Sequence, residues 1–314
     1  MSAWLRRGMD RTKAPRYRRR AAGCVLLLLV LWVGHSIWRS YHSPVLRTWE
    51  IEAGCLGAPV RLLVLSDLHG CLTEADGALL DLAAEAEPDL ILLDGDMLNS
   101  DSPNAERVAA LVRRFSGVAP VYYAWGNHER DYLRAGTSDL QSELETAGAT
   151  VLEKSFTDIQ VRGVSIRLGG LYDYAFAQDD HNTCDPESMA PEVYSFLRAF
   201  QDTDAYKIML SHRPDSFLFG EATATWDIDL VVSGHDHGGQ VVLPLLGGVF
   251  GGDQGLFPTY IHGVYQKGRL TFAITSGLGS QRERLPRFNN PPELMVLDLV
   301  PADGPERGDT CGAT

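Results

Sequence analysis

The fold is decided by residues 62–70, which read Leu-Leu-Val-Leu-Ser-Asp-Leu-His-Gly. The apolar half of this stretch suits a strand that is buried on both faces. The polar half places a carboxylate, Asp67, and an imidazole, His69, just beyond the carboxyl end of that strand. Open α/β sheets bind their ligands at this end of their strands. The stretch therefore predicts an α/β fold with a ligand site that begins here.

The residues after Val60 alternate between strand and helix patterns, which predicts parallel strands joined by helices. Shorter apolar runs over 150–170 surround Gly163 and are typical of antiparallel hairpins, and a segment rich in glycine and proline follows Val241. The other expected strands are 60–66, 89–93, 120–124, 206–211, 260–265, 270–275 and 293–298. The expected helices lie near 74–86, 104–116 and 191–201.

Charge is unevenly distributed along the 314 residues, of which 45% are hydrophobic and 22% are charged. This length and composition predict one large globular domain. Eight basic residues and one acidic residue give residues 1–20 a charge of +7, which leaves −20 for the remainder of a net −13. Nucleic-acid binding needs clustered cations, so the acidic body argues against a nucleic-acid partner. Metal ions could still bind phosphates in such a domain.

A membrane segment is predicted over residues 21–38, which read AAGCVLLLLVLWVGHSIW and contain no lysine, arginine, aspartate or glutamate. A spanning helix needs roughly 20 mostly apolar residues. Because the basic residues precede this run, we expect the N-terminus in the cytoplasm and the body outside the cell membrane. A cleaved signal, including a twin-arginine signal, is the alternative, but no small-x-small cleavage site follows Ile37. A buried core helix fits the preceding cations poorly.

These features predict five regions along the chain. They are a basic cytoplasmic N-terminus (1–20), a transmembrane signal-anchor (21–38), a linker (39–59), a catalytic domain (60–300) and a C-terminal tail (301–314). The five cysteines show no C-x-x-C spacing, which argues against a zinc ribbon and a dense disulfide frame. One disulfide among Cys55, Cys71, Cys184 and Cys311 stays open, because its pairing cannot be read from spacing.

Polar motifs follow five of the expected strands. A single aspartate or histidine at a strand end is usually a cap or a satisfied loop residue. Five such motifs in the same topological position instead predict one shared site. Carboxylate, amide and imidazole ligands without thiolates suit manganese, iron, zinc or similar ions, and their number points to two ions. The motifs are Ser66-Asp67-Leu68-His69, Asp94-Gly95-Asp96, Gly126-Asn127-His128-Glu129, Ser211-His212-Arg213-Pro214 and the sequence GHDHGGQ at 234–240.

This ordered set resembles the motifs of the calcineurin-like metallophosphoesterases, and the resemblance runs from about Val60 to Leu299. GHDHGGQ at 234–240, GLFPTY at 255–260, and SGLG with NPPEL within 276–294 further resemble the membrane-associated bacterial phosphodiesterases of the YkuE and YaeI type. The resemblance implies a four-layer α-β-β-α sandwich. It also implies two divalent ions of unknown identity, with Asp96 bridging them and His128 as general acid. One ion would be held by Asp67, His69 and His237, and the other by Asn127, His212 and His235.

The resemblance implies hydrolysis of phosphate esters by two metal ions. We expect a phosphodiesterase that acts on a phospholipid, lipid-linked or envelope substrate at the outer face of the membrane. A phosphomonoesterase and a nucleotide-sugar-lipid pyrophosphohydrolase are alternatives within the enzyme class. A non-catalytic protein that keeps the metals as a scaffold is disfavoured, because all seven ligands are present.

The chain departs from the family pattern at Asn99, where many relatives have an aspartate that orients the catalytic histidine. Asn99 cannot stabilise an imidazolium as a carboxylate would, and Asp101 is an alternative partner for His128. Asp94 is expected to be a loop or packing residue, and Glu129 and Asp236 to support the ligands. Three arginines near the C-terminal glycine loop are expected either to contact a substrate phosphate or to form a solvated turn: Arg282, Arg284 and Arg287.

Overall fold

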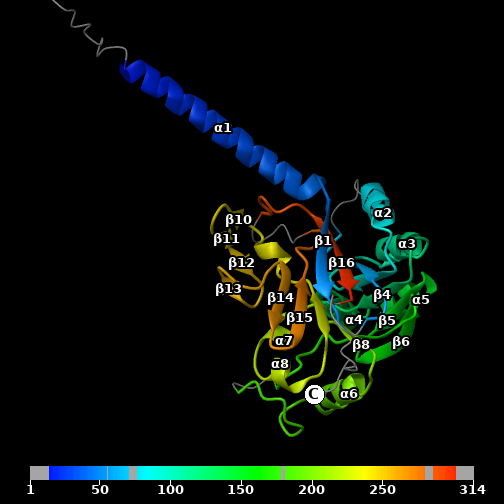
Figure 1. The fold of residues 1–314 in the computed structure, drawn as a ribbon. Coiled ribbons are helices and arrows are strands. Elements are labelled where there is room, and N and C mark those ends of the chain that lie inside the picture. Colours follow the sequence, from blue (N-terminus) through cyan, green and yellow to red (C-terminus); the bar gives the residue numbers. More distant parts are fainter. Residues whose placement is uncertain (1–13, 55, 71–75, 178–180, 280–285, 302–314) are drawn as a thin grey trace, which may run out of the picture.

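Two six-stranded mixed sheets form the body of the protein, and a long helix projects from it (Figure 1). The computed structural model describes residues 14–54, 56–70, 76–177, 181–279 and 286–301. The predicted tail beyond Pro301 and the first 13 residues of the predicted basic N-terminus lie outside the described residues, as do Cys55, Cys71, Cys311, Arg282 and Arg284. Cys24 and Cys184 are both free thiols.

The first sheet contains the strand that was quoted from the sequence, which becomes β2 (Val60–Leu65). Strands β2 to β5 run parallel, β16 pairs antiparallel to β2, and β1 pairs parallel to β16 at the edge. The sheet order is β1 (Val45–Glu52), β16 (Glu293–Val300), β2, β3 (Leu90–Asp94), β4 (Val121–Ala124) and β5 (Ala149–Leu152).

The second sheet is built around four parallel strands, with an antiparallel strand at each edge. Its order is β14 (Gly263–Lys267), β15 (Leu270–Ile274), β9 (Leu230–Ser233), β8 (Tyr206–Leu210), β7 (Val164–Gly170) and β6 (Ser155–Val161). Between β9 and β14 the chain forms the short helix η1 (His237–Gly239) and two small hairpins. These are β10 (Val242–Leu243) with β11 (Gly247–Gly248), and β12 (Phe250–Gly251) with β13 (Gly255–Leu256).

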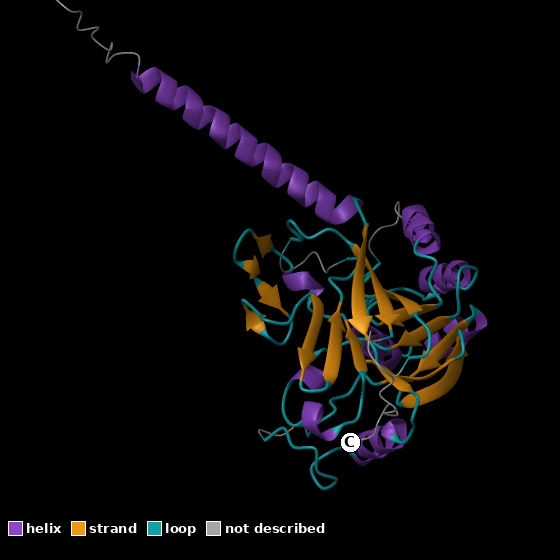
Figure 2. Cartoon of the chain, viewed as in Figure 1, coloured by secondary structure: helices purple, strands orange, loops and turns teal. Residues whose placement is uncertain are grey.

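Helices cover the outer face of each sheet, which gives four layers in the order α-β-β-α (Figure 2). This confirms the predicted fold class. The helices on the first sheet are α2 (Asp76–Glu85), α3 (Glu106–Phe115), α4 (Asn127–Ala135) and α5 (Leu140–Thr146), and those on the second are α6 (Pro191–Gln201), α7 (Asp215–Leu218) and α8 (Ala222–Thr225). Helices α4 and α5 were not predicted, because α4 begins within a motif that reads as a loop.

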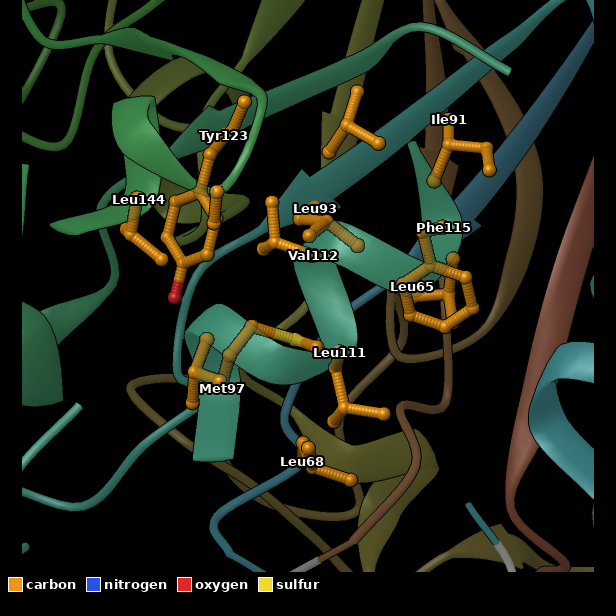
Figure 3. Packing of buried hydrophobic residues seen from close by; sticks show 14 of the residues in the cluster. Leu65, Leu68, Ile91, Leu93, Met97, Leu111, Val112, Phe115, Tyr123 and Leu144 are labelled. Atoms are coloured by element: carbon orange, nitrogen blue, oxygen red, sulfur yellow. The ribbon is translucent and has the colours of Figure 1, made fainter. Parts of the chain in front are cut away.

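The uninterrupted apolar run of β2 is explained by its position between two cores. Alternate side chains of a strand point to opposite faces. Leu63 and Leu65 pack against the helices, whereas Leu62 and Val64 pack into the core between the sheets. Figure 3 shows the outer cluster, in which Leu65 lies close to Phe115 of α3. A strand that is buried on both faces needs apolar residues at every position, and so it shows no alternation.

The segment predicted as a linker differs from that expectation, because β1 occupies much of residues 39–59. Its side chains are mostly half-buried or exposed, as is common for an edge strand, so the sequence carries little apolar signal. The register joins Val45 to Glu293 and Glu52 to Val300. The strand therefore belongs structurally to the sheet that carries Asp67.

Helix α1 (Ala14–His42) contains the predicted membrane segment and is long and apolar enough to cross a membrane. Its C-terminal end is attached to the body by specific contacts. The Asn290 backbone amide donates to Ser40 Oγ at 3.0 Å, and the Arg287 amide donates to Tyr41 Oη at 2.8 Å. The helix and the segment just before β16 therefore meet at one point of the surface.

Gly170 tests how closely the two sheets must approach. A Cβ atom at this position would lie 2.3 Å from the carbonyl oxygen of Leu152 in β5. We expect Gly170→Ala to destabilise the protein by about 1–3 kcal/mol, because the backbone must shift to relieve this overlap. Thermal unfolding of the detergent-solubilised full chain measures the effect. Gly57→Ala is the matched control, since a Cβ atom there meets no atom within 4 Å. Equal unfolding midpoints for the two variants would contradict the prediction.

Candidate metal centre

The carboxyl ends of strands from both sheets converge on one cavity of about 520 Å³. Asp67 and His69 follow β2, Asp96 follows β3, and the other predicted residues follow β4, β8 and β9. Its described lining residues are His69, Asp96, Asn127, His128, His235, Asp236, His237, Gln240, Phe250 and Gly252. Asp67 and His212 lie beneath this lining and are fully buried. The structure thus brings all eight predicted site residues together.

Two buried carboxylates form the centre of the site. Asp67 Oδ1 lies 3.8 Å from His69 Nε2 and 3.7 Å from both His212 Nε2 and His237 Nδ1. Asp96 Oδ2 lies 3.2 Å from His212 Nε2 and 3.8 Å from His69 Nε2. Most of these separations are too long for direct hydrogen bonds. Apart from the close pair of His212 and Asp96, the imidazoles therefore surround the carboxylates without bonding directly to them.

Among the buried polar atoms at this centre that have no hydrogen-bond partner in the described residues are three on predicted ligands: His69 Nε2, His212 Nε2 and Asn127 Oδ1. Leaving a buried polar atom unpaired costs about 1–3 kcal/mol, so native proteins rarely do so without a reason. Imidazole nitrogens and hard oxygens are suitable donors for divalent first-row cations. The residues present therefore fit divalent metal ions.

Hydrogen bonds at Nδ1 orient three of the histidines; in His69 and His212 this nitrogen is opposite to the one nearest Asp67, whereas in His237 it is the same nitrogen. His69 Nδ1 lies 3.0 Å from Asn99 Oδ1, His212 Nδ1 lies 2.6 Å from the Asp94 carbonyl oxygen, and His237 Nδ1 lies 3.1 Å from the Gly279 carbonyl oxygen. Each oxygen can only accept, so each Nδ1 donates a proton. This leaves Nε2 with a lone pair, which is the form that binds a metal.

The pKa values of the two carboxylates favour their charged forms. Burial opposes ionisation, but His237 and His212 hold the pKa of Asp67 well below its ordinary value. Burial likewise opposes ionisation of Asp96, and His212 makes the largest contribution that lowers its pKa. A protonated histidine and a metal ion are alternative partners for such anions. Metal binding at this site is therefore expected to release protons.

Asp94 differs from its neighbours, because burial raises the pKa of its carboxyl group to about 8. The side chain is therefore largely neutral at pH 7. The residue contributes its backbone carbonyl oxygen, which accepts hydrogen bonds from Ser66 Oγ at 2.8 Å and from His212. This geometry agrees with the expectation that Asp94 is a loop or packing residue.

Glu129 holds the loops after β3 and β4 together. Its fully buried carboxylate accepts hydrogen bonds from the backbone amides of Asp96 at 2.7 Å, Met97 at 2.8 Å and Gly126 at 2.9 Å. It also accepts one from Tyr123 Oη at 2.7 Å. Glu129 therefore supports the metal site, as expected, by fixing the backbone that carries Asp96.

His128 is oriented by a partner that the sequence did not indicate. The backbone amide of Ser100 donates to His128 Nδ1 at 3.1 Å, whereas Asn99 is bonded to His69. An amide N–H can only donate, so Nδ1 accepts and the ring proton is on Nε2. Asp101 is exposed. A backbone donor leaves no trace in a side-chain motif, and this is why the pattern pointed to Asn99 or Asp101.

The ligand positions share an unusual backbone conformation. Asp67, His69, Asp96, His235 and His237 all have positive φ angles, between 47° and 68°. Positive φ is uncommon outside glycine, although aspartate and histidine tolerate it better than most residues. Such strained conformations cluster at functional sites because they aim side chains that a relaxed backbone could not.

Close packing explains one of the motif glycines. A Cβ atom at Gly234 would lie 2.0 Å from Ser66 Oγ and 2.5 Å from Asp67 Oδ2. Any side chain at this position would therefore displace a predicted ligand. The amide of the next residue, His235, donates to both carboxylate oxygens of Asp67 at 3.2 Å. The glycine thus lets the β9 loop reach the β2 loop.

Arg287 corrects an expectation, because it is neither a solvated residue nor a phosphate ligand. Its guanidinium group is fully buried and donates to backbone carbonyl oxygens, including Gly279 at 2.6 Å and Ser276 at 2.7 Å. Nearby Asn290 donates to the carbonyl oxygen of His237 at 2.7 Å. Both residues therefore hold the loops around His237, a role that spacing in the sequence did not indicate.

A family model of calcineurin-like phosphoesterases matches residues 60–239. The chain belongs to this family. The phosphodiesterase YaeI of Escherichia coli K12 is 30% identical over 77% of this chain and 83% of its own length. The metallophosphoesterase YkuE of Bacillus subtilis 168 is 29% identical over 68% of this chain and 69% of its own length. An uncharacterised metallophosphoesterase of Helicobacter pylori J99 is 27% identical over 84% of this chain and 67% of its own length.

These comparisons confirm the predicted resemblance to the calcineurin-like phosphoesterases and to their YkuE and YaeI branch. Calcineurin-like phosphoesterases use divalent metal ions, and the ligand clusters of this chain agree with that requirement. The protein is therefore a phosphoester hydrolase.

The proton position on His128 can be measured directly. Burial lowers the pKa of its imidazole below the ordinary value, and the Ser100 amide occupies Nδ1, so the neutral Nε2–H form is expected at pH 7. Protonation should appear only below the ordinary histidine pKa of about 6.5. Nitrogen NMR of the full chain labelled with ¹⁵N-histidine reports the tautomer. A His128→Gln variant assigns the signal, and a doubly protonated ring at pH 7 would contradict the prediction.

Proposed function

We propose that the protein is a phosphodiesterase that uses two divalent ions held by the seven predicted ligands. The observation that carries this proposal is the set of unpaired buried donors around Asp67 and Asp96. Three groups of described residues have ligand atoms within 4.8 Å of one another, and two of them support the division between two ions, while the third joins His69 and Asp96 to His128. One group is Asp67, His69 and His237, and the other is Asp96, His212 and His235. Asn127, which lines the same cavity, completes the second set, and Asp96 is assigned to both ions.

Divalent ions held by these residues would supply positive charge that offsets the phosphate charge, and would lower the pKa of a bound water molecule toward neutral pH. The chain contributes orientation and a proton donor. Asn99, Asp94 and Gly279 each accept a hydrogen bond from Nδ1 of one histidine ring, which fixes the ring and leaves its Nε2 unprotonated. His128 is assigned to the leaving-group oxygen, where the Nε2–H of its neutral ring would stabilise the developing negative charge by a hydrogen bond. The amide of His128 also donates to Asp96 Oδ1 at 2.8 Å, which couples the donor to the ligand.

The charge of the cavity favours a diester over a monoester. None of the described residues that line it is lysine or arginine. A monoester carries close to two negative charges at neutral pH and would rely on the metal ions alone, whereas a diester carries one. Phe250 adds an apolar wall on which a second ester group can pack. The name of the relative YaeI, a phosphodiesterase, points in the same direction.

The membrane is the proposed location of the substrate. Helix α1 supports an anchor at residues 21–38, with the basic residues 1–20 in the cytoplasm and the body, from β1 onward, outside. We propose a phospholipid or another lipid-linked envelope phosphodiester, because the anchor keeps the cavity close to such molecules. A nucleotide-sugar-lipid pyrophosphohydrolase is less favoured, since it would require the body on the cytoplasmic side.

Asp96→Asn tests the bridging assignment. Removing one negative charge between the two proposed ions should lower the bound metal by at least one ion per chain and reduce hydrolysis of bis(p-nitrophenyl) phosphate by at least about a hundredfold. Metal content is measured by mass spectrometry after gel filtration of the full chain in detergent. The matched control is Asp94→Asn, which replaces a neutral buried acid with a neutral isostere and should retain both ions. An Asp96→Asn variant with full metal content and full activity would refute the assignment.

His128→Gln tests the proton donor. The substitution should leave the metal content unchanged, because the His128 side chain is not assigned as a ligand. It should slow hydrolysis of an alkyl phosphodiester by about 10²–10⁴-fold, whereas p-nitrophenyl esters, whose leaving group needs little protonation, should slow much less. The comparison of the two leaving groups in steady-state kinetics measures the role. Full activity on the alkyl diester would exclude it.

A further inference from the structure

Four exposed apolar side chains are carried by the two small hairpins, two in the turn of the first and two at the open end of the second. Leu245 and Leu246 lie in the β10–β11 turn with exposed fractions of 105% and 67%, and Leu256 and Phe257 lie at the end of β13 with 71% and 59%. Outside α1, the described part of the chain has one other large exposed hydrophobic residue, Phe219 at 41%. Single exposed apolar residues are normal, but a cluster of four usually marks an interaction surface.

The segment that carries this cluster is almost uncharged. Between Val241 and Tyr260 the one charged residue is Asp253, and its carboxylate pairs with Arg213. The rest of the body is strongly acidic, with a charge of about −20 outside the first 20 residues. Asp253 lies in the β12–β13 turn, and none of the four exposed apolar residues is charged, so inserting their side chains into an apolar environment does not itself bury a charged group.

The hairpins are attached to the point at which α1 leaves the body. The Val242 amide donates to the Phe288 carbonyl oxygen at 2.9 Å, and Asn289 Nδ2 donates to the Val242 carbonyl oxygen at 3.3 Å. The Phe288 ring in turn packs edge-on against Trp32 of α1, with a centroid separation of 5.4 Å. In Figure 1 the hairpins lie on the side of the body from which α1 leaves, and α6 lies on the opposite side.

The position of Trp32 along α1 gives the depth of this contact. Trp32 precedes Trp38, the last residue of the predicted span, by six residues, which corresponds to about 9 Å along a helix axis. Elements that lie in a membrane interface penetrate by about 5–10 Å. When α1 spans a bilayer, Phe288 and the adjoining hairpin therefore reach the level of the interface.

We propose that Leu245 and Leu246 in the β10–β11 turn, together with Leu256 and Phe257 at the end of β13, insert into the surface of the same lipid bilayer that α1 spans. This inference rests on the proposed function of α1 as an anchor and deepens it. A second copy of this chain is the competing occupant of the patch. The continuity of the hairpins with α1 favours the bilayer, because a partner chain would have to fit between the patch and the membrane.

Membrane docking also defines the substrate class. Phe250 of β12 and Gly252 line the cavity that contains the predicted ligands, and Gln254 Nε2 donates to Asp236 Oδ2 at 2.8 Å. The hairpin that enters the interface is thus also one wall of the active site. The mouth of the cavity then opens at headgroup level, where it receives phosphodiesters of amphiphilic lipids without extracting them far from the bilayer.

Fluorescence quenching tests docking without reference to activity. The full chain, with Cys24, Cys55, Cys71 and Cys311 changed to serine, is placed in phosphatidylcholine and phosphatidylglycerol nanodiscs and labelled with a nitrobenzoxadiazole dye at Leu256→Cys. A spin-labelled phosphatidylcholine with a shallow doxyl group should quench this dye strongly. The same dye at Ser195→Cys, on the exposed surface of α6, is the control and should not be quenched. Equally weak quenching at both positions would overturn the proposal.

Kinetics with two substrates that share a leaving group test the substrate class. Leu246→Glu combined with Leu256→Glu should lower hydrolysis of phosphatidyl-p-nitrophenol in the nanodiscs by about tenfold or more, because a carboxylate at these two positions opposes insertion into the bilayer. Hydrolysis of soluble bis(p-nitrophenyl) phosphate should change by less than about twofold. Phe219→Glu is the matched control, since it adds the same charge to an exposed apolar residue that lies outside the hairpins.

The outcomes separate the two proposals. If the unmodified chain hydrolyses neither substrate but the dye at residue 256 is quenched, the result contradicts the proposed activity and supports docking. Equal loss on both substrates in the charged variant contradicts docking as the basis of lipid selectivity. If residue 256 is not quenched and the charged variant converts a dimer to a monomer in detergent, the patch is an interface between copies and docking is overturned.

Discussion

Asp67 and Asp96 impose the main constraint on this structure, because two carboxylates are kept charged inside a protein core. Transferring an anion from water into the interior is costly unless opposite charge compensates for it. The chain surrounds the pair with imidazoles from β8 and β9 and with backbone amides from neighbouring loops. The strained backbone at the ligand positions and the close approach of Gly234 follow from the same requirement. These are costs that the two packed sheets must offset elsewhere.

Much of the architecture could be predicted because burial on both faces leaves a strong signal. The run in β2 and the polar residues that follow each strand indicated the parallel core and a shared site, and the structure brings all eight predicted residues to one cavity, six in its lining and two beneath it. The edge strand β1 was taken for a linker, since a half-exposed strand needs few apolar side chains. Helix α4 was missed for a related reason, because the motif from Asn127 to Glu129 hides the start of the helix.

The supporting contacts of the site could not be predicted from the sequence. The Ser100 amide on His128 is a backbone contact, and a backbone donor is present at every residue except proline. Arg287 was judged by its charge, which usually indicates solvent or an anion, whereas its guanidinium group binds the carbonyl oxygens of a buried loop. The sequence left Asn99 and Asp101 as alternative partners of His128, whereas Asn99 bonds to His69 and the Ser100 amide bonds to His128. Partner choice of this kind depends on three-dimensional packing.

The position of β16 between β1 and β2 has a consequence for biosynthesis. The first sheet pairs residue 45 with residue 293, so its order cannot be completed until the last strand has left the ribosome. Long-range pairing of this kind slows folding, because the loop between the partners must close first. Helix α1 is synthesised first, and as an anchor it would hold the unfinished chain at the membrane throughout this interval. His237 joins Asp67 only after the two sheets have packed together, so the metal site is among the last parts of the structure to form.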